Sequence, residues 1–164
     1  MSRVFWIALS FLLSCSCAAR PEPPPRAAAE AQNEIARLLD DWHAAASRAD
    51  EEAYFAPIAE RGVFLGTDAT ERWEKAAFRA CAHPHFAKGK AWSFRAVERH
   101  IEISSTGDVA WFDERLETAN LGLARGSGVL VREPSSGRFR IAHYNLAITV
   151  PNERFGDVKA LLAK

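Results

Sequence analysis

Three consecutive segments between Gly107 and Val150 constrain the fold of this chain more than any other feature. They span residues 108–117, 121–133 and 138–150, and each is rich in Val, Ile, Leu, Phe, Trp or Tyr. β-Branched and aromatic residues favour strands, and the Pro-Ser-Ser-Gly run at 134–137 supplies the residues of a hairpin turn. The sequence therefore predicts a block of three antiparallel strands against which the preceding helices pack.

Side-chain parity predicts which residues of this block share a face, because directly opposed residues point the same way. If the hairpins turn at Ala119 and at 134–137, Asp113 opposes Arg125, Trp111 opposes Ser127, and Ser127 opposes His143. The apolar end of this face is formed by Val109, Val129, Val131, Phe139 and Ile141. At its other end the face carries a polar cluster of Asp113, Arg125, Ser127, His143 and Asn145. A face that grades from core to polar residues is typical of a half-filled ligand pocket.

Two interpretations of the polar cluster stay open. As a site, Asp113 is a general base with a pKa raised by desolvation, and His143 exchanges a proton near neutral pH. Arg125 then binds an anionic group, and Asn145 donates to a developing oxyanion. As a structural feature, Asp113 and Arg125 form a cross-strand ion pair on a wetted face. The opposite face has small residues, which allow a second subunit to approach and predict a homodimer through the sheet.

The N-terminal residues 1–17 have the form of a targeting segment. Arg3 precedes a short apolar run that is too short to span a bilayer, and the run ends in Leu-Leu-Ser before Cys15. This end resembles a bacterial lipobox, which implies lipidation of Cys15 and a protein anchored to the cell envelope on the periplasmic or outer side. Ordinary cleavage near Ala18, giving a secreted or periplasmic protein, is the alternative. Residues 18–29, rich in Pro and Ala, are expected to be a tether.

Residues 30–164 then form one domain that begins with helices. Residues 30–49 carry an apolar stripe at helical spacing that includes Trp42, and Asp50 is placed to cap a second helix over 51–59. A short strand is expected at 62–67.

The second half of the helical region has a capping-box pattern. Asp68 and Glu71 are placed to cap a third helix that buries Trp73, Ala76, Ala77, Ala80 and Cys81 and ends at His83-Pro84. A long strand is expected over 91–104, and its apolar residues change parity, which predicts a bulge between Ala96 and Glu98. A short helix is expected over 153–163.

Composition and residue spacing exclude several classes of function. Acidic and basic residues balance at 21 each with no basic cluster, which argues against nucleic-acid binding. Cys81 is the one cysteine of the predicted mature domain, so no internal disulfide is expected. His83 and His85 have no evident third partner, so no metal site is predicted. Trp42, Tyr54 and Trp73 are expected in the core, where they can also form a cavity wall that contacts a ligand.

The order of elements and several short runs together support a family resemblance. The runs are Trp42, Asp50 and Tyr54, then FLGTD at 64–68 with Glu71 and Trp73, then AWFDE at 110–114, RGSGVL at 125–130 and RIAHYN at 140–145. This pattern, over about residues 34–148, resembles the α+β cone of NTF2-like proteins and, within them, the SnoaL-like proteins. The resemblance implies three N-terminal helices packed in a curled, mostly antiparallel sheet.

The resemblance leaves the function open, because this fold hosts isomerases, cyclases, dehydratases, epoxide hydrolases and binding domains without catalysis. Enzymes of the superfamily commonly use an Asp or His inside the cone, and many have a second His where this chain has Asn145. We therefore expect a domain that binds a small, mostly apolar ligand without a cofactor. The alternatives are a cofactor-independent isomerase, cyclase or hydratase that uses Asp113 or His143, and a non-catalytic interaction domain of the cell envelope.

Overall fold

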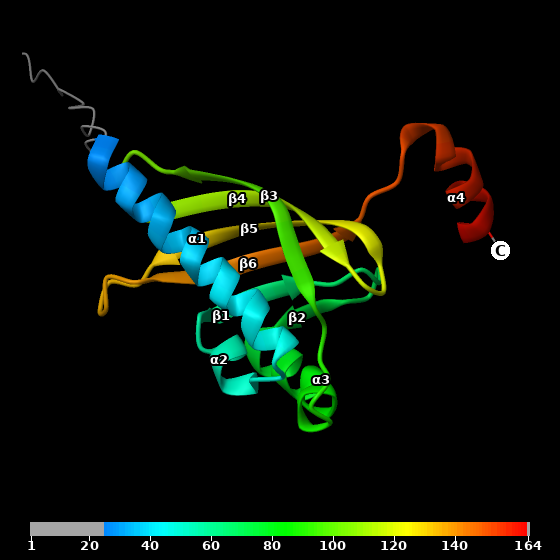
Figure 1. Cartoon of the computed structure of the whole chain (residues 1–164), viewed down its shortest axis with the longest axis horizontal. Coiled ribbons are helices and arrows are strands. Elements are labelled where there is room, and N and C mark those ends of the chain that lie inside the picture. Colours follow the sequence, from blue (N-terminus) through cyan, green and yellow to red (C-terminus); the bar gives the residue numbers. More distant parts are fainter. Residues whose placement is uncertain (1–24, 164) are drawn as a thin grey trace, which may run out of the picture.

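The computed structural model describes residues 25–163, and Figure 1 shows how their helices and strands are arranged. In chain order the elements are α1 (Pro25–Ser47), α2 (Glu51–Phe55), β1 (Ile58–Leu65), β2 (Arg72–Glu74), α3 (Lys75–Ala87), β3 (Phe94–Ile103), β4 (Val109–Thr118), β5 (Gly122–Arg132), β6 (Phe139–Ile148), a 3-10 turn η1 (Asn152–Arg154) and α4 (Phe155–Leu162). The predicted targeting segment and Cys15 lie outside the described residues. Residues 25–29, which were assigned to the tether, belong to α1.

The strands form one curled sheet in the order β2-β1-β6-β5-β4-β3. All neighbouring pairs are antiparallel except β1 and β6, which run parallel. Helix α1 lies across one face of the sheet, while α2 and α3 gather beside β1 and β2 (Figure 1). The predicted α+β architecture, with three N-terminal helices against a curled and mostly antiparallel sheet, is confirmed.

Helix α1 packs on the sheet through the predicted apolar stripe. Ile35, Leu39, Trp42 and Ala46 are buried, whereas Asp40 and Asp41 on the other side are exposed. The stripe recurs every three or four residues, as one face of a helix requires. Helix α2 begins as predicted at Asp50, whose Oδ1 accepts a hydrogen bond from Ala53 N–H at 3.0 Å. It ends at Phe55, ahead of the predicted end at residue 59.

The sheet has an inner face, which the helices cover, and an outer face. Along β4 every second residue is buried, so Ala110, Phe112, Glu114 and Leu116 point to the inner face. Trp111 and Asp113 point to the outer face, where Trp111 is 49% exposed.

The β4–β5 hairpin has a different register from the predicted one. Asp113 pairs with Ser127, Trp111 pairs with Val129, and Arg115 pairs with Arg125, so the pairing is displaced by two residues. The cause is the turn, which lies between the paired residues Thr118 and Gly122 and so later in the chain than the predicted turn at Ala119. Gly122, which begins β5 after the turn, has a positive φ of 71°. A displacement of two residues preserves parity, so the residues predicted to share a face still do.

Two bulges change side-chain parity within the sheet. In β3, Ala96 pairs with Leu116 and Glu98 pairs with Arg115, so Val97 is the extra residue and the predicted bulge is confirmed. A second bulge, in β6, was not predicted. Leu130 pairs with Ile141 and Val129 pairs with His143, which leaves Ala142 as the extra residue. Phe139 and Ile141 therefore point to the inner face, and the predicted shared face with His143 is wrong for these two residues.

The region 68–87 differs most from expectation. Asp68 and Glu71 do exchange local hydrogen bonds, but they form a turn that leads into β2, and Trp73 lies in that strand. Helix α3 begins later, at Lys75, and it buries Phe78, Ala82 and Phe86. The predicted buried residues Ala76, Ala77, Ala80 and Cys81 are exposed.

Helix α3 also continues through Pro84 to Ala87, so the predicted end at His83-Pro84 is wrong. A proline inside a helix removes one backbone donor, and here the burial of Phe86 at 4% exposure offsets that loss.

The end of the chain stands apart from the sheet. Helix α4, predicted over 153–163, forms at Phe155–Leu162 and has no buried residue, and Figure 1 shows it away from the other helices.

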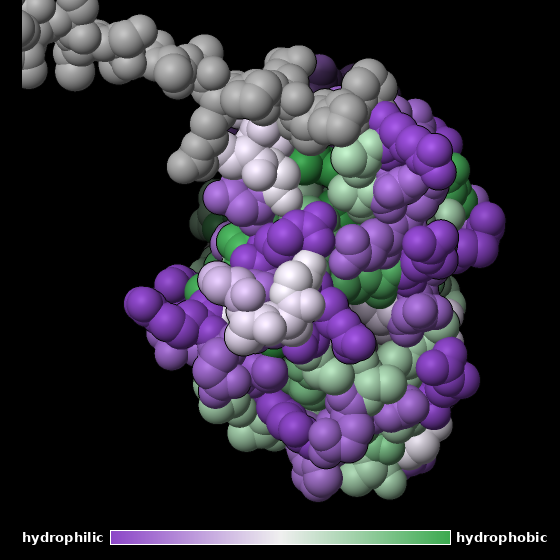
Figure 2. All heavy atoms as spheres, turned by 90° about the vertical axis from the view of Figure 1, so that its left-hand side faces the viewer, coloured by the Kyte–Doolittle hydropathy of each residue, from purple (hydrophilic) through white to green (hydrophobic). Residues whose placement is uncertain are grey.

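At the opposite end of the molecule, hydrophilic side chains cover most of the surface (Figure 2). Within residues 25–163 no helix is both long and apolar enough to cross a membrane.

Candidate functional site

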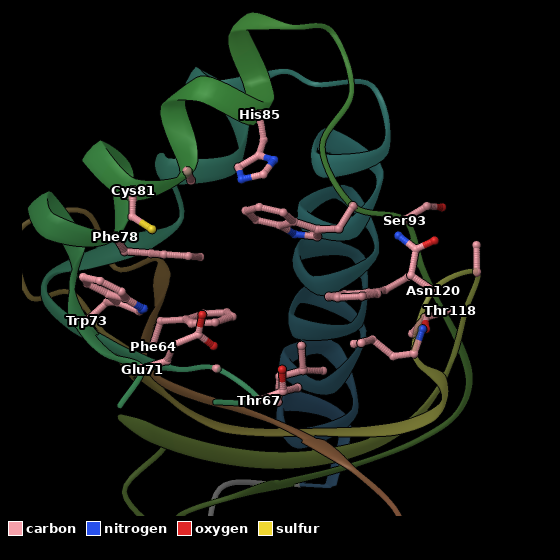
Figure 3. A pocket seen from close by; sticks show the side chains of 17 residues that line it. Phe64, Thr67, Glu71, Trp73, Phe78, Cys81, His85, Ser93, Thr118 and Asn120 are labelled. Atoms are coloured by element: carbon pink, nitrogen blue, oxygen red, sulfur yellow. The ribbon is translucent and has the colours of Figure 1, made fainter. Parts of the chain in front are cut away.

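The main cavity lies between α3, the β1–β2 hairpin, the segment before β3 and the β4–β5 turn. Its volume is about 290 Å³. The lining residues are Phe64, Gly66, Thr67, Glu71, Trp73, Phe78, Cys81, Ala82, His85, Trp92, Ser93, Phe94, Thr118, Ala119, Asn120, Leu121 and Leu146. Figure 3 shows side chains from these separate elements converging on one space.

Aromatic rings form much of the wall. The Phe64 and Phe78 rings stack with centroids 4.1 Å apart and an angle of 17° between them. The ring of Trp92 is nearly parallel to that of Phe78, at 20° and 6.0 Å. Trp73 and Phe94 complete the aromatic part of the lining. Parallel rings of this kind present flat faces on which an apolar or aromatic ligand can stack.

The polar groups of the cavity come from opposite sides. His85 and Cys81 point into it from α3, while Glu71 points in from the β1–β2 hairpin (Figure 3). Thr118 and Asn120 of the β4–β5 turn lie on a further side. Few polar groups among many apolar ones are typical of a small-molecule site, in which they fix the orientation of the ligand.

The position of Glu71 is fixed by its own turn. Its Oε2 accepts a hydrogen bond from Asp68 N–H at 3.2 Å, and Gly66 N–H donates to the Glu71 carbonyl oxygen at 3.1 Å. A Cβ atom on residue 66 would collide with the Glu71 carboxylate, so only glycine allows this close approach.

A second group of polar side chains is buried under α1 and centres on Glu114, whose side chain is fully buried. Its Oε1 lies 2.8 Å from His43 Nε2 and accepts from the Tyr144 hydroxyl at 3.2 Å, and its Oε2 accepts from Arg99 Nε at 2.8 Å. Arg99 also donates to Asp40 Oδ1 at 2.8 Å and to the Ala36 carbonyl oxygen at 3.1 Å. We call Glu114, His43, Arg99 and Tyr144 the buried network.

Glu114 is ionised in this network. Burial acts to raise its pKa, but the hydrogen bond from His43 and the attraction to His43 and Arg99 outweigh burial, and the pKa lies below its usual 4.5. An ionised carboxylate only accepts hydrogen bonds, so His43 carries its proton on Nε2 and donates. Burial, and then the charge of Glu114, raise the pKa of Tyr144 well above 10, so its hydroxyl keeps its proton.

The buried network does not line the cavity but lies directly behind its wall. The His43 ring meets the ring of Phe94 edge-on at 6.0 Å, and Tyr144 stacks on Phe64 at 5.5 Å. Phe94 and Phe64 are both cavity residues. The network therefore supports the wall.

The structure places the predicted polar cluster on the outer face of the sheet. Asp113 and Arg125 are exposed and line a polar groove of about 230 Å³, together with residues of β3 such as Glu98 and His100. Ser127, His143 and Asn145 are half-buried, and none of the predicted polar cluster lines the main cavity. The predicted polar cluster therefore lies apart from the main cavity, because inner-face residues alternate with it and α1 covers the inner face (Figure 1).

The four predicted aromatic ligand contacts, Trp42, Tyr54, Trp73 and Trp111, divide among the core, the cavity and the outer face. Trp73 lines the cavity. Trp42 and Tyr54 are buried and stack on each other at 5.1 Å, and burial raises the pKa of the Tyr54 hydroxyl. The fourth, Trp111, lies on the outer face and does not line the cavity.

The sequence interpretation missed His85, Trp92 and Asn120 as cavity residues and assigned Glu71 to a helix cap. For His85 a usable signal existed, because it is four residues from Cys81 and a helix places such residues on one side. That signal was obscured by ending the helix at Pro84.

A comparison of the sequence with models of protein families identifies the family of this chain. The model of the SnoaL-like domain matches residues 35–151, which is most of the chain and includes every residue of the buried network and the cavity. The chain therefore belongs to the SnoaL-like family. No curated protein matches it.

Solved structures support the NTF2-like fold. An NTF2-like protein of unknown function from Pseudomonas putida KT2440 is 17% identical with a TM-score of 0.64, covering 76% of this chain and 91% of that one. A protein from Novosphingobium aromaticivorans, provisionally described as an aromatic ring hydroxylase, is 16% identical with a TM-score of 0.63 and covers 75% and 92%. A provisional dehydratase of the NTF2-like family from Streptomyces avermitilis is 13% identical with a TM-score of 0.60 and covers 75% and 99%.

Within residues 25–163 no three His, Cys, Asp or Glu side chains are grouped so that they could hold a metal ion.

Proposed function

We propose that this SnoaL-like domain binds a small, mostly apolar molecule in the main cavity. The observation that carries the proposal is the stacked wall of Phe64, Phe78 and Trp92 around about 290 Å³, with a few polar side chains facing inward. A flat apolar ligand gains from leaving water and from stacking on these rings.

Filling the cavity tests the proposal. Cys81 points into the cavity from α3, and its neighbour Ala80 is exposed without lining it (Figure 3). The probe is N-phenyl-1-naphthylamine, an uncharged dye whose fluorescence rises in apolar sites. We expect saturable binding to the full-length protein, a loss of affinity of about tenfold or more in Cys81→Trp because the indole occupies the space, and unchanged binding in Ala80→Trp. Equal binding by both variants would contradict the proposal.

A catalytic role is the second candidate, and the observation that favours it is the pair of Glu71 and His85 on opposite sides of one cavity. Such a pair can act as base and acid on a molecule held between them. Similar structures described provisionally as a dehydratase and a hydroxylase agree with this role. Asp113 and His143, the candidates from the sequence, would have to act at the outer face. The test uses the ligand that is released from the protein after purification from its own host. If wild type converts this ligand and His85→Gln does not, the domain is an enzyme.

We also propose that the domain is attached to the bacterial cell envelope through a lipid on Cys15. The apolar run followed by Leu-Leu-Ser-Cys supports it. In cell fractionation the wild type should sediment with membranes, and Cys15→Ala should not. If the wild type is found in the soluble fraction and its mass includes no acyl chains, the lipid anchor is wrong and the protein is secreted without one.

A homodimer through the outer face of the sheet is a further proposal. The inner face is occupied by the chain itself, whereas Trp111 on the outer face is 49% exposed. Aromatic residues of this kind are enriched in interfaces between proteins. Sedimentation should give a dimer for the wild type and a monomer for Trp111→Glu. A monomeric wild type would overturn this proposal.

A further inference from the structure

The main cavity is lined by one side chain of fixed charge, and that charge is negative. Among its lining residues there is one carboxylate, Glu71, and neither lysine nor arginine. His85 adds an imidazole, and the remaining polar side chains are uncharged. The cavity therefore contains no fixed positive charge that could bind a carboxylate, phosphate or sulfate group of a ligand.

Glu71 also differs from the other carboxylates on the inner side of the sheet. Glu114 is bound by Arg99, and Glu51, beside α3, is bound by Arg79 at 2.7 Å. No lysine, arginine or histidine among residues 25–163 forms an ion pair with Glu71. The described hydrogen bond of its carboxylate is local and comes from Asp68 N–H. Because Glu71 lines the cavity, its negative charge lies at the cavity wall without a described cation to neutralise it.

The aromatic wall and Glu71 both favour a ligand with a positive charge. Figure 3 shows the Glu71 carboxylate beside Phe64, with Trp73 and Phe78 on the same side of the cavity. The face of an aromatic ring carries negative charge density and attracts cations, with tryptophan the strongest. A positive group beside Glu71 would gain from both, whereas an anion would be repelled by both.

We propose, resting on the proposed function above, that the ligand of this cavity is an organic cation: an amine or quaternary ammonium group joined to an apolar or aromatic body. The cationic end lies at Glu71 and Trp73, and the apolar body stacks on Phe64, Phe78 and Trp92. Asn120 and Thr118 remain for polar groups at the other end of the ligand.

Three bicyclic aromatic probes of similar size and different charge test this assignment by titration calorimetry on the full-length protein at pH 8. They are N-methylquinolinium, a cation, quinoline, which is neutral at this pH, and 2-naphthoate, an anion. We expect N-methylquinolinium to bind about tenfold tighter than 2-naphthoate or more, with quinoline between them. Glu71→Gln should weaken N-methylquinolinium about fivefold to tenfold and change quinoline by less than about twofold, because only the charge is removed.

Glu71→Gln retains an oxygen that can accept from Asp68 N–H, so the turn is preserved, and an unchanged circular dichroism spectrum checks this. The matched control is Glu74→Gln, because Glu74 is three residues further along the chain, at the end of β2, is exposed and does not line the cavity. It should leave all three affinities unchanged.

The outcomes separate the two proposals. Equal or tighter binding of 2-naphthoate, or an unchanged N-methylquinolinium affinity in Glu71→Gln, overturns the charge assignment while leaving a ligand cavity. Loss of N-methylquinolinium affinity in Glu74→Gln equal to that in Glu71→Gln also overturns it, because the attraction would then be unspecific. If none of the three probes binds and Cys81→Trp leaves dye binding unchanged, the proposed function itself fails.

Discussion

Asp113 and Glu114 are neighbours in the chain, yet they occupy opposite environments. Glu114 lies on the inner face with no exposure of its side chain and is bound by His43, Arg99 and Tyr144. Asp113 lies on the outer face, is exposed, and borders the polar groove there. Side chains alternate along β4, so these two neighbours point to opposite faces. The carboxylate of Glu114 must therefore be paired, whereas water can solvate that of Asp113.

A carboxylate contributes differently to the stability of the fold on the two faces of the sheet. A buried charge without a partner is very costly, so the buried network holds α1, β3, β4 and β6 in one arrangement. A charge on the outer face is already hydrated and contributes little. Because Phe94 and Phe64 lie between the buried network and the cavity, the network also sets the shape of the cavity wall.

The largest expected effect comes from removing the buried charge. Glu114→Gln leaves the Arg99 guanidinium without its buried partner and should lower the free energy of unfolding by about 3–5 kcal/mol. Asp113→Asn is the matched control and should change it by less than about 0.5 kcal/mol. Urea denaturation measures both. Equal effects of the two variants would mean that the faces do not differ as described.

The space around the buried network gives the next prediction. A Cβ atom on Gly126 would lie 2.8 Å from Glu114 Oε1 and would also collide with the Tyr144 hydroxyl. Gly126→Ala should therefore cost about 1–3 kcal/mol in denaturant unfolding. Gly156→Ala in α4 serves as control, because a Cβ there meets no atom within 4 Å, and it should be neutral or slightly stabilising. A neutral Gly126→Ala would contradict the close packing.

Acid should weaken the inner face through Glu114. Its pKa is lower in the folded protein than its usual 4.5, so the folded state binds this proton less readily than the unfolded state. The stability that this carboxylate contributes is full above the unfolded pKa and is lost as pH falls through the folded pKa. The stability difference between wild type and Glu114→Gln should therefore shrink between pH 7 and pH 3. A constant difference would show that Glu114 does not titrate as described.

The smallest effect is expected on the outer face. Arg125 is exposed and forms no ion pair among the described residues, so Arg125→Ala should change the unfolding free energy by less than about 0.5 kcal/mol. It should also leave dye binding unchanged, which a fluorescence titration checks. A clear loss of binding would move the ligand to the outer groove.

The sequence predicted the fold well because its strongest signals are local. Alternation along 108–150, the stripe around Trp42 and the parity change near Val97 each reflect a short repeat, and each appears in the structure. The start of the third helix, predicted at the Asp68 cap, was misplaced because the Asp68–Glu71 pattern fits a turn as well as a helix cap, and only the pairing of β2 with β1 decides between them.

The main cavity was not predicted from the sequence because its place depends on which face of the sheet α1 covers. Alternation alone defines two faces and does not say which is inside, so it could not place Asp113 and His143 on the outer face. The cavity is formed by α3, the β1–β2 hairpin and the β4–β5 turn, which are distant in sequence and meet only through the curl of the sheet. Glu71 and His85 could not be brought together without that curvature.

Native mass spectrometry of the full-length protein, purified gently from its own host, tests most directly that the inner cavity is the ligand site. The account predicts an additional bound mass that is retained in Arg125→Ala, on the outer face, and lost in Cys81→Trp, which fills the cavity. A bound mass that persists in Cys81→Trp and disappears in Arg125→Ala would contradict it and assign the ligand to the outer groove.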